Sequence, residues 1–388
     1  MKKKKRRFYI IGIIPVLLLS GGLLFLQKEQ SEANTLDAEK LFNTKHITRD
    51  SFVEGKTYEE SITIAAIGDI LIHDTVFEDA RTTDSFDFKP MLAPVKEALM
   101  KPDILLANQE TILGGIELGL SGYPTFNSPR EVGEALMDSG VDIVSTANNH
   151  TLDKGEKGVQ SSMSYMTEVG LPYVGSFKDQ EDKQRLRILN HSGINIAYLS
   201  YTYGTNGIPV PEGKDFLVNL IDKAAMKEEI HRAKEVSDVV VMSIHWGNEY
   251  QRFPDTIQQE LAQFIVDEGV DVVFGHHPHV LQPMEWLKAQ DGRQALVIYS
   301  LGNFLSGQMW DYKDIGGMAS VDIIKQVSPK GTTVELANPA FFPTYVASKG
   351  QRNYKVVPLK QASDFGLEDA SAKYEEILTH MMDPLNIN

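Results

Sequence analysis

The segment GHHPHV, residues 275–280, places three histidines within four positions. The chain has no cysteine, so any metal ion must be bound by His, Asp, Glu or Asn side chains. Pro278 favours an extended conformation for the residue before it, and in an extended segment residues i and i+2 point to the same side. We therefore expect His277 and His279 to face one site and His276 to face away. The alternative is a loop that is rich in histidine for structural reasons only.

Further residues suited to metal binding or acid–base chemistry follow the apolar runs of the chain, where strands would end. They are Asp69 and His73, Asn108 and Glu110, Asn148, Asn149, His150 and Asp153, His245 and Glu249, and Asn303. In open α/β sheets the ligand site lies outside the carboxyl ends of the strands, so these residues can converge in space. The histidines at positions 46, 191, 231 and 380 lie elsewhere and are expected at the surface.

Each of these side chains has a defined chemical use. Asp69 and Glu110 would supply negative oxygen ligands, and Glu110 could bridge two ions; capping of the helices that follow is the alternative. Asn149 offers a neutral oxygen, which leaves His150 free to protonate a leaving group. Asp153 either orients the His150 ring or caps a helix that starts near residue 155. A bound divalent ion lowers the pKa of a coordinated water to about 7, so this set of residues is typical of a hydrolase.

The apolar runs that precede these residues predict strands. They are SITIAAIG, DILLA, VDIVSTA, INIAYLSY, DVVVMSI, DVVFG and ALVIYSLG. Several are nearly continuous in Val, Ile and Leu, as expected for strands covered on both faces. Helices are predicted between them, with Ser128 as an N-cap before Pro129, at about 222–236 and at about 256–268. This alternation predicts an α/β fold. After residue 316 shorter β-like runs follow, and then a helix near 372–382.

The N-terminus carries the pattern of a membrane signal-anchor. A basic tail, residues 1–7, precedes an apolar run, residues 8–26, which is close to the roughly 20 residues that span a bilayer. The positive end is expected to stay in the cytoplasm, so residues 27–60 would form an extracellular tether and the main domain would be extracellular. The alternative is a signal peptide cleaved after residue 33, which gives a secreted protein.

The charge is distributed unevenly along the chain. The formal net charge is −15, but residues 1–30 carry seven Lys or Arg and one Glu, which leaves −21 on residues 31–388. So acidic a domain repels nucleic acid, and we predict no nucleic-acid partner. It would attract divalent cations, although a solvated acidic surface is the more common explanation of such a composition.

Six motifs, in this order, resemble one known family. They are GDILIH (68–73), NQET (108–111), ANNHTLDKG (147–155), HWGNEY (245–250), GHHPHVLQ (275–282) and YSLGNF (299–304). Together they resemble the CapA/PgsA family of poly-γ-glutamate capsule biosynthesis proteins, which is related to calcineurin-like metallophosphoesterases. The resemblance implies an αββα two-sheet sandwich over residues 61–315, with residues 316–388 as a β-rich extension and terminal helix packed on the same domain.

The resemblance also implies roles for individual residues. The metal ligands of the family correspond to Asp69, Glu110, Asn149, His245, His277 and His279, with His150 as the proton donor, but Thr151 stands where an aspartate usually follows. The phosphoesterase pattern has a histidine two positions after the first aspartate, but Leu71 stands there in this chain, so His73 and Asn108 become further candidate ligands. The implied cofactor is one or two divalent ions, Mn, Zn, Fe or Mg.

Three functions remain open from the sequence. The resemblance implies a membrane-anchored extracellular component of poly-γ-glutamate synthesis and export, with the membrane, other synthase and export subunits and the polyglutamate chain as partners. The retained histidines also suit an independent extracellular metal-dependent hydrolase of phosphodiesters or cell-wall polymers. The leucine at position 71 suits a non-catalytic scaffold with a degenerate metal site. Catalytic activity is therefore left undecided by the sequence.

Overall fold

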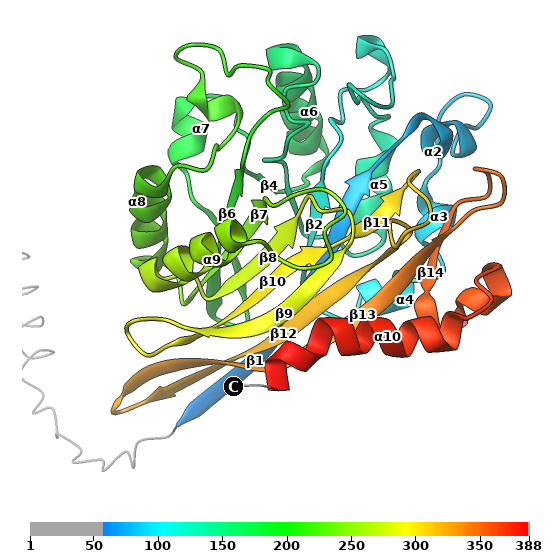
Figure 1. The fold of residues 1–388 in the computed structure, drawn as a ribbon. Helices are drawn as coiled ribbons and strands as arrows, with labels where there is room; N and C mark the ends of the chain where they lie inside the picture. The colour runs from blue at the N-terminus through cyan, green and yellow to red at the C-terminus, as the bar shows by residue number, and fades with distance from the viewer. Residues whose placement is uncertain (1–56, 387–388) are drawn as a thin grey trace, which may run out of the picture. The chain divides into compact units, whose positions relative to one another are not determined.

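Two β-sheets face each other, and helices cover the outer face of each, in the computed structural model, which describes residues 57–386 (Figure 1). The alternation of side chains along strand β1 (Tyr58–Leu71) shows how the layers form. Ile64 and Ala66 point into the core between the sheets, whereas Ala65 and Ile67 point into the core beneath the helices. Because successive side chains of a strand point to opposite faces, a nearly continuous apolar run fits this position, and the predicted α/β fold with two sheets is confirmed.

The first sheet has eight strands in the order β14-β13-β12-β1-β2-β3-β4, with β11 paired to the end of β1. Strands β1 to β4 are parallel to one another, whereas β12, β13 and β14 are added in antiparallel pairs. The remaining strands of this sheet are β2 (Ile104–Gln109), β3 (Ile143–Ser145), β4 (Tyr173–Val174), β11 (Asn303–Ser306), β12 (Ile315–Ser328), β13 (Gly331–Ala347) and β14 (Lys355–Pro358).

The second sheet has six strands in the order β5-β6-β7-β8-β10-β9. Strands β6, β7, β8 and β10 are parallel, and β5 and β9 pair antiparallel at the two edges. The strands are β5 (Arg187–His191), β6 (Ile194–Thr202), β7 (Val239–His245), β8 (Val272–His276), β9 (Leu281–Lys288) and β10 (Gln294–Leu301). All seven apolar runs of the sequence therefore form strands, as predicted.

Helices α2 to α6 cover the first sheet, and α8 and α9 cover the second. The helices are α2 (Asp74–Asp79), α3 (Lys89–Leu92), α4 (Lys96–Leu99), α5 (Glu131–Asp138), α6 (Gly155–Val169), α7 (Gln180–Gln184), α8 (Lys223–Lys234), α9 (Thr256–Glu268) and α10 (Ala370–Met382). Short 3-10 helices are η1 (Ile116–Leu118), η2 (Asp215–Leu217), η3 (Leu359–Phe365) and η4 (Asp383–Asn386).

The helices predicted at about 222–236 and about 256–268 form as α8 and α9. Helix α9 begins after Asp255, which forms a capping box with Gln258, and α8 begins after Asp222, whose side chain accepts from the backbone of the first turn. The N-cap predicted at Ser128 is wrong, because α5 begins only at Glu131. The Ser128 hydroxyl instead donates a hydrogen bond to Thr111, so a buried polar contact replaces the cap.

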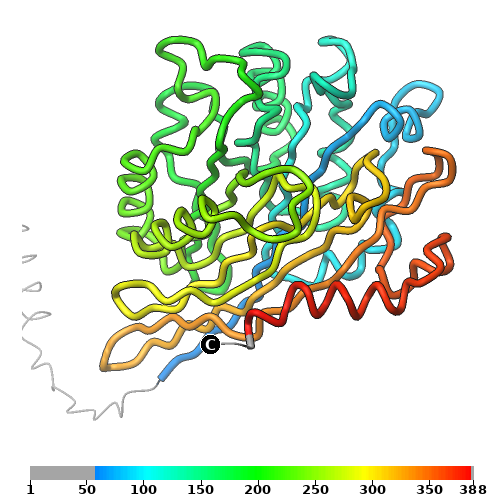
Figure 2. Tube along the Cα trace, viewed as in Figure 1, coloured from blue at the N-terminus to red at the C-terminus, as the bar shows by residue number. Residues whose placement is uncertain are grey.

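The residues from β12 onward belong to the same two-sheet domain. Strands β12 and β13 extend the first sheet from β1, and α10 lies along them, as the red end of the trace shows (Figure 2). Ile377 and Met381 of α10 are fully buried in the core between the sheets. The C-terminal segment therefore closes one edge of the sandwich.

The predicted cytoplasmic tail, the apolar segment 8–26 and the tether up to residue 56 lie outside the described residues. Strand β1 begins at Tyr58 rather than at Ser61, so the last residues of the predicted tether are part of the sheet. Within residues 57–386, no helix combines the length and the apolar character needed to cross a bilayer.

Candidate metal centre

The polar residues at the strand ends converge at one edge of the two sheets. Asp69 lies in β1 and Glu110 directly follows β2 in the first sheet, whereas His245 ends β7 in the second sheet. The Nε2 atom of His245 lies 3.6 Å from Oε1 of Glu110, and Nε2 of His279 lies 3.7 Å from the same oxygen. Because parallel strands end at the same edge of a sheet, residues far apart in sequence meet there.

Glu110 is the central residue of this cluster. Its side chain is 1% exposed, and within residues 57–386 neither carboxylate oxygen has a hydrogen-bond partner. Burial raises the pKa of Glu110 well above its ordinary value. A buried carboxylate without hydrogen bonds is unfavourable unless a cation or a proton compensates it. Glu110 therefore fits a ligand position for a divalent ion.

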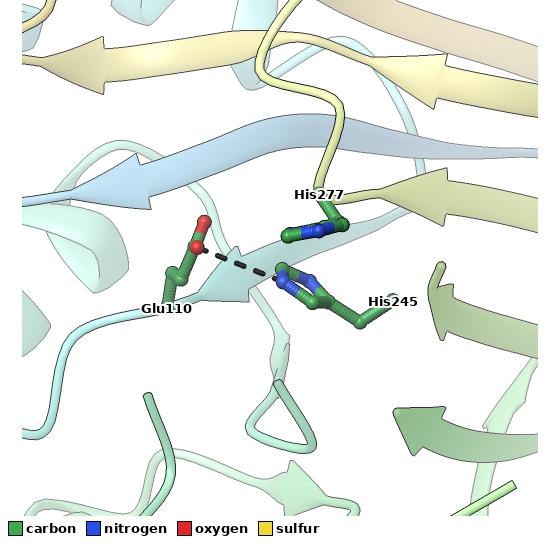
Figure 3. A group of neighbouring side chains, drawn as sticks. All are labelled: Glu110, His245 and His277. Atoms are coloured by element: carbon green, nitrogen blue, oxygen red, sulfur yellow. Dashed lines mark ion pairs between the residues drawn. The ribbon is translucent and has the colours of Figure 1, made fainter. Parts of the chain in front are cut away.

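The first ligand group consists of Glu110, His245 and His277, with one ligand atom of each lying within 4.8 Å of the others (Figure 3). Asn149 borders this group, since its Oδ1 lies 2.9 Å from Nε2 of His245. Burial lowers the pKa of His245 well below its ordinary value and that of His277 to about 3. Both rings are therefore neutral at pH 7 and have a nitrogen lone pair available for a metal ion.

The second ligand group consists of Asp69, Glu110 and His279, again with ligand atoms within 4.8 Å of one another. Burial favours the neutral form of Asp69, but the neighbouring His276 and His279 rings outweigh it and hold the pKa well below its usual range. Burial likewise opposes charging of His279, but Glu110 and Asp69 outweigh it and raise its pKa to about 9. Since both ligand groups share Glu110, the arrangement can accommodate one ion or two ions bridged by this carboxylate.

Asn108 contacts Asp69 directly, and its role as a metal ligand stays a prediction. Its Nδ2 donates to Oδ1 of Asp69 at 2.8 Å, and its own Oδ1 accepts from the Ser145 hydroxyl at 3.2 Å. The amide is therefore engaged on both sides. Asn108 orients the carboxylate of Asp69 and leaves the other oxygen, Oδ2, directed toward His279.

His73 lies outside both ligand groups. Its Nδ1 is 3.0 Å from the carbonyl oxygen of Leu71 and 3.2 Å from the backbone nitrogen of Gly307. Burial lowers its pKa to about 4. The backbone engages only this ring nitrogen, and the role of His73 as a substitute for the histidine absent from position 71 stays a prediction.

His150 and Asp153 form a close pair at the wall of a cleft. Nδ1 of His150 lies 2.7 Å from Oδ2 of Asp153, which also accepts from the backbone nitrogen of Phe126. The Phe126 ring packs edge-on against His150 with centroids 4.7 Å apart. Helix α6 begins without a side-chain cap, so Asp153 orients His150 rather than capping this helix. The cleft has a volume of about 360 Å³ and is lined by Leu71, His73, Tyr123, Phe126, His150, Glu249, Tyr250, His279 and Gln308.

The segment GHHPHV adopts a different conformation from the predicted one. His277 has φ 97° and His279 has φ 57°, so neither residue is extended. The backbone is held instead by hydrogen bonds from Trp246 N to the oxygen of His276 and from Tyr250 N to the oxygen of Pro278. The two imidazoles still meet, with ring centroids 5.8 Å apart.

The expectation that His276 faces away is wrong. Its Nδ1 lies 3.2 Å from Oδ1 of Asp69, and the side chain is 1% exposed. The reason is that His276 ends β8 and its side chain follows the pleat of this strand toward the first sheet. His276 therefore holds the side of Asp69 opposite to His279.

Two contacts of the site had no signal in the sequence. Asn206 accepts a hydrogen bond from Asn149 Nδ2 at 3.2 Å, and its own Nδ2 lies 3.4 Å from Nδ1 of His150. The Tyr203 ring packs against His277, with centroids 4.6 Å apart. Tyr203 and Asn206 lie in the connection that follows strand β6. The other site residues also follow strands, and this shared position is the only feature of the sequence that could have pointed to these two.

Known proteins resemble this chain over the region that carries the site. The family model described as Bacterial capsule synthesis protein PGA_cap matches residues 63–308. The chain is 33% identical over 190 residues to capsule biosynthesis protein CapA of Bacillus anthracis, which covers 47% of this chain and 44% of that protein. It is 30% identical over 192 residues to PGA biosynthesis protein CapA of Bacillus subtilis (strain 168), and this alignment covers 47% of this chain and 47% of that protein. The chain thus spans about half the length of these curated relatives.

Similarity to solved structures is more distant. The calcineurin-like phosphoesterase YfkN from Bacillus subtilis aligns with a TM-score of 0.46 and 14% sequence identity, covering 82% of this chain and 99% of that one.

Proposed function

The chain belongs to the family of bacterial capsule synthesis proteins described as PGA_cap, and from that premise we propose that it is a membrane-anchored extracellular component of poly-γ-glutamate synthesis and export. The family match and the two CapA relatives confirm the resemblance inferred from the motifs. We further propose that the two-sheet sandwich is of the calcineurin-like metallophosphoesterase type and that it holds divalent metal.

One observation carries this proposal: two groups of metal-ligating side chains share the buried, unpartnered carboxylate of Glu110. Asp69 and His279 would hold one side of the centre, and His245 and His277 the other, with Asn149 adjacent. A divalent ion bound there would lower the pKa of a coordinated water and polarise a phosphoryl or carbonyl oxygen. His150, oriented by Asp153, would hold the proton for a leaving group at the cleft wall.

The charge of the chain supports a metal in this role. Residues 31–388 carry a formal −21, which repels a polyanion such as polyglutamate at long range. A divalent ion in the cleft would offset this repulsion locally. The partners in this proposal are the membrane, through residues 8–26, other synthase and export subunits, and the polyglutamate chain. Nucleic acid is not among them.

The experiment is gene deletion followed by complementation, with the poly-γ-glutamate yield as the readout. We expect the deletion to abolish the polymer, the wild-type gene to restore it, and the double variant His277→Ala/His279→Ala to fail. The double variant His191→Ala/His231→Ala is the matched control, because both of its histidines are solvent-exposed and lie outside the site. An unchanged yield after deletion would refute the function, and full complementation by His277→Ala/His279→Ala would favour a non-catalytic scaffold.

A second candidate function is an independent metal-dependent hydrolase, and the His150–Asp153 pair favours it. A scaffold has no need of an oriented imidazole at the wall of an open cleft. Purified protein loaded with Mn²⁺ should then cleave a chromogenic phosphodiester, and His150→Ala should reduce the rate without loss of metal. A metal-loaded protein without such activity would leave the capsule role as the better account.

A further inference from the structure

The subsite around Asp69 offers three candidate protein ligands, and the histidine that the resemblance implies as a fourth ligand is absent. Asp69, Glu110 and His279 bring their ligand atoms together, but Leu71 occupies the position at which the resemblance implies a histidine. His73 is not among these ligand atoms, and its Nδ1 contacts the backbone at Leu71 and Gly307. A metal ion bound here would therefore need a further protein ligand or an additional water molecule.

Glu249 lies beside this subsite and forms a third group of candidate ligands with His277 and His279. One of its carboxylate oxygens lies within 4.8 Å of ring nitrogens of both His277 and His279. His277 belongs to the ligand group of His245, and His279 belongs to that of Asp69. The carboxylate of Glu249 therefore lies near one histidine of each group.

The backbone fixes Glu249 in this position. The segment that carries it is bonded to the histidine loop at both ends, by Trp246 N to the His276 oxygen at 3.1 Å and by Tyr250 N to the Pro278 oxygen at 2.7 Å. Gly247 makes the turn between them with φ 77°, and a Cβ at this position would lie 2.5 Å from the Gln258 side chain. The position of Glu249 relative to His277 and His279 is therefore set by main-chain contacts.

The side chain of Glu249 differs from Glu110 in its surroundings. Glu110 is buried, whereas Glu249 is exposed and lines the open cleft. The charge of Glu249 also contributes to raising the pKa of Glu110, so the two carboxylates repel each other unless a cation compensates them. An exposed glutamate can rotate onto an ion and remain hydrated without it.

The geometry points to Glu249 as a metal ligand on the cleft side of the centre, which compensates for the histidine absent from position 71. This inference rests on the metal centre of the proposed function. Carboxylate oxygens suit Mn²⁺ and Mg²⁺, whereas imidazole suits Zn²⁺ and Fe²⁺. Glu249 therefore makes the subsite of Asp69 richer in oxygen than the subsite of His245 and His277.

The test is calorimetric titration of Mn²⁺ into metal-stripped full-length protein. We expect Glu249→Gln, which keeps the shape but removes the charge, to weaken the binding of one ion about tenfold or more, within the range known for perturbed metal sites. Glu260→Gln is the matched control, because Glu260 is an exposed glutamate on the nearby helix α9, and it should bind as the wild type does. Thermal unfolding of both variants checks that the fold is intact.

The possible outcomes separate this inference from the proposed function. The inference would be overturned if Glu249→Gln bound Mn²⁺ with the same stoichiometry as the wild type and an affinity within twofold. A loss of activity in such a variant would not rescue the inference, because it would assign Glu249 to substrate chemistry. A wild-type protein that binds no Mn²⁺ would refute both the inference and the metal centre. Normal Mn²⁺ binding that depends on Glu249, together with an unchanged polymer yield after gene deletion, would refute only the capsule role.

Discussion

The Nδ1 atom of His279 lies 3.0 Å from Oδ2 of Asp69, although 210 positions separate the two residues in the sequence. Asp69 belongs to the first sheet, and His279 follows β8 of the second sheet. Both side chains are almost completely buried. The pair therefore joins the carboxyl ends of the two sheets, and any change that separates the sheets at this edge should disturb the metal centre.

Gly68 is the position at which this edge is most sensitive to added volume. A Cβ on Gly68 would lie 2.0 Å from the carbonyl oxygen of Gly302, whose backbone also accepts from Asp69 N at 2.8 Å. We expect Gly68→Ala to lower the free energy of unfolding by about 2 kcal/mol or more, as overpacking of a rigid backbone does. Gly204→Ala is the control, because nothing lies within 4 Å of a Cβ there. Equal denaturation midpoints for the two variants would contradict this account of the edge.

Asp153→Asn should separate proton transfer from metal binding. An asparagine oxygen in the place of Oδ2 can still contact both Phe126 N and Nδ1 of His150, but the substitution removes the negative charge beside the His150 ring. For a phosphodiester with a poor leaving group we expect the rate to fall about 100-fold, which is typical for loss of general acid catalysis. The metal content should stay at the wild-type level, because Asp153 belongs to neither ligand group. An unchanged rate would show that His150 does not donate the proton.

Asn206 should fix the orientation of the Asn149 amide. It accepts from Asn149 Nδ2, so Oδ1 of Asn149 is directed to His245. Without this acceptor the amide can rotate and present its NH₂ group, which is no metal ligand. We expect Asn206→Ala to weaken Mn²⁺ binding about tenfold, as loss of an orienting contact does, and Asn206→Asp to retain most of the affinity. If the alanine and aspartate variants bind Mn²⁺ equally well, Asn206 has no such role.

The strands and the residues that end them were predictable from the sequence, because buried parallel strands need continuous apolar runs and their carboxyl ends must share one edge. The shape of GHHPHV was not predictable. His277 has a positive φ because main-chain bonds from Trp246 and Tyr250 hold the loop, and no local rule reports bonds between segments so far apart. Asn206 was missed for the same reason. Its contacts with Asn149 and His150 depend on how the connection after β6 folds over the site.

The terminal helix α10 should make the stability of the protein depend on pH. Burial opposes ionisation of Glu376, but hydrogen bonds from Lys373, Tyr312 and Arg252 outweigh it and lower the pKa from 4.5 to about 2. The folded pKa is thus below the unfolded value, so Glu376 stabilises the fold above pH 4.5, and this contribution is lost as the pH falls toward about 2.

Glu376→Gln should therefore be less stable than the wild type at pH 7, and the difference should shrink as the pH falls below 4.5. Urea denaturation at a series of pH values measures this difference. Glu375→Gln is the control, because Glu375 is the exposed neighbour on the same helix, and it should match the wild type throughout. A difference for Glu376→Gln that stays constant with pH would show that the carboxylate charge is not the cause.

The metal content of the purified full-length protein tests the central claim most directly, by elemental analysis of the wild type and of Glu110→Gln after reconstitution with Mn²⁺. We predict at least one ion per wild-type chain and almost none in Glu110→Gln, because both ligand groups share this carboxylate. Glu110→Gln should remain folded, since glutamine keeps the shape of the side chain. A folded wild type without metal, or a Glu110→Gln variant with as much metal as the wild type, would contradict the account.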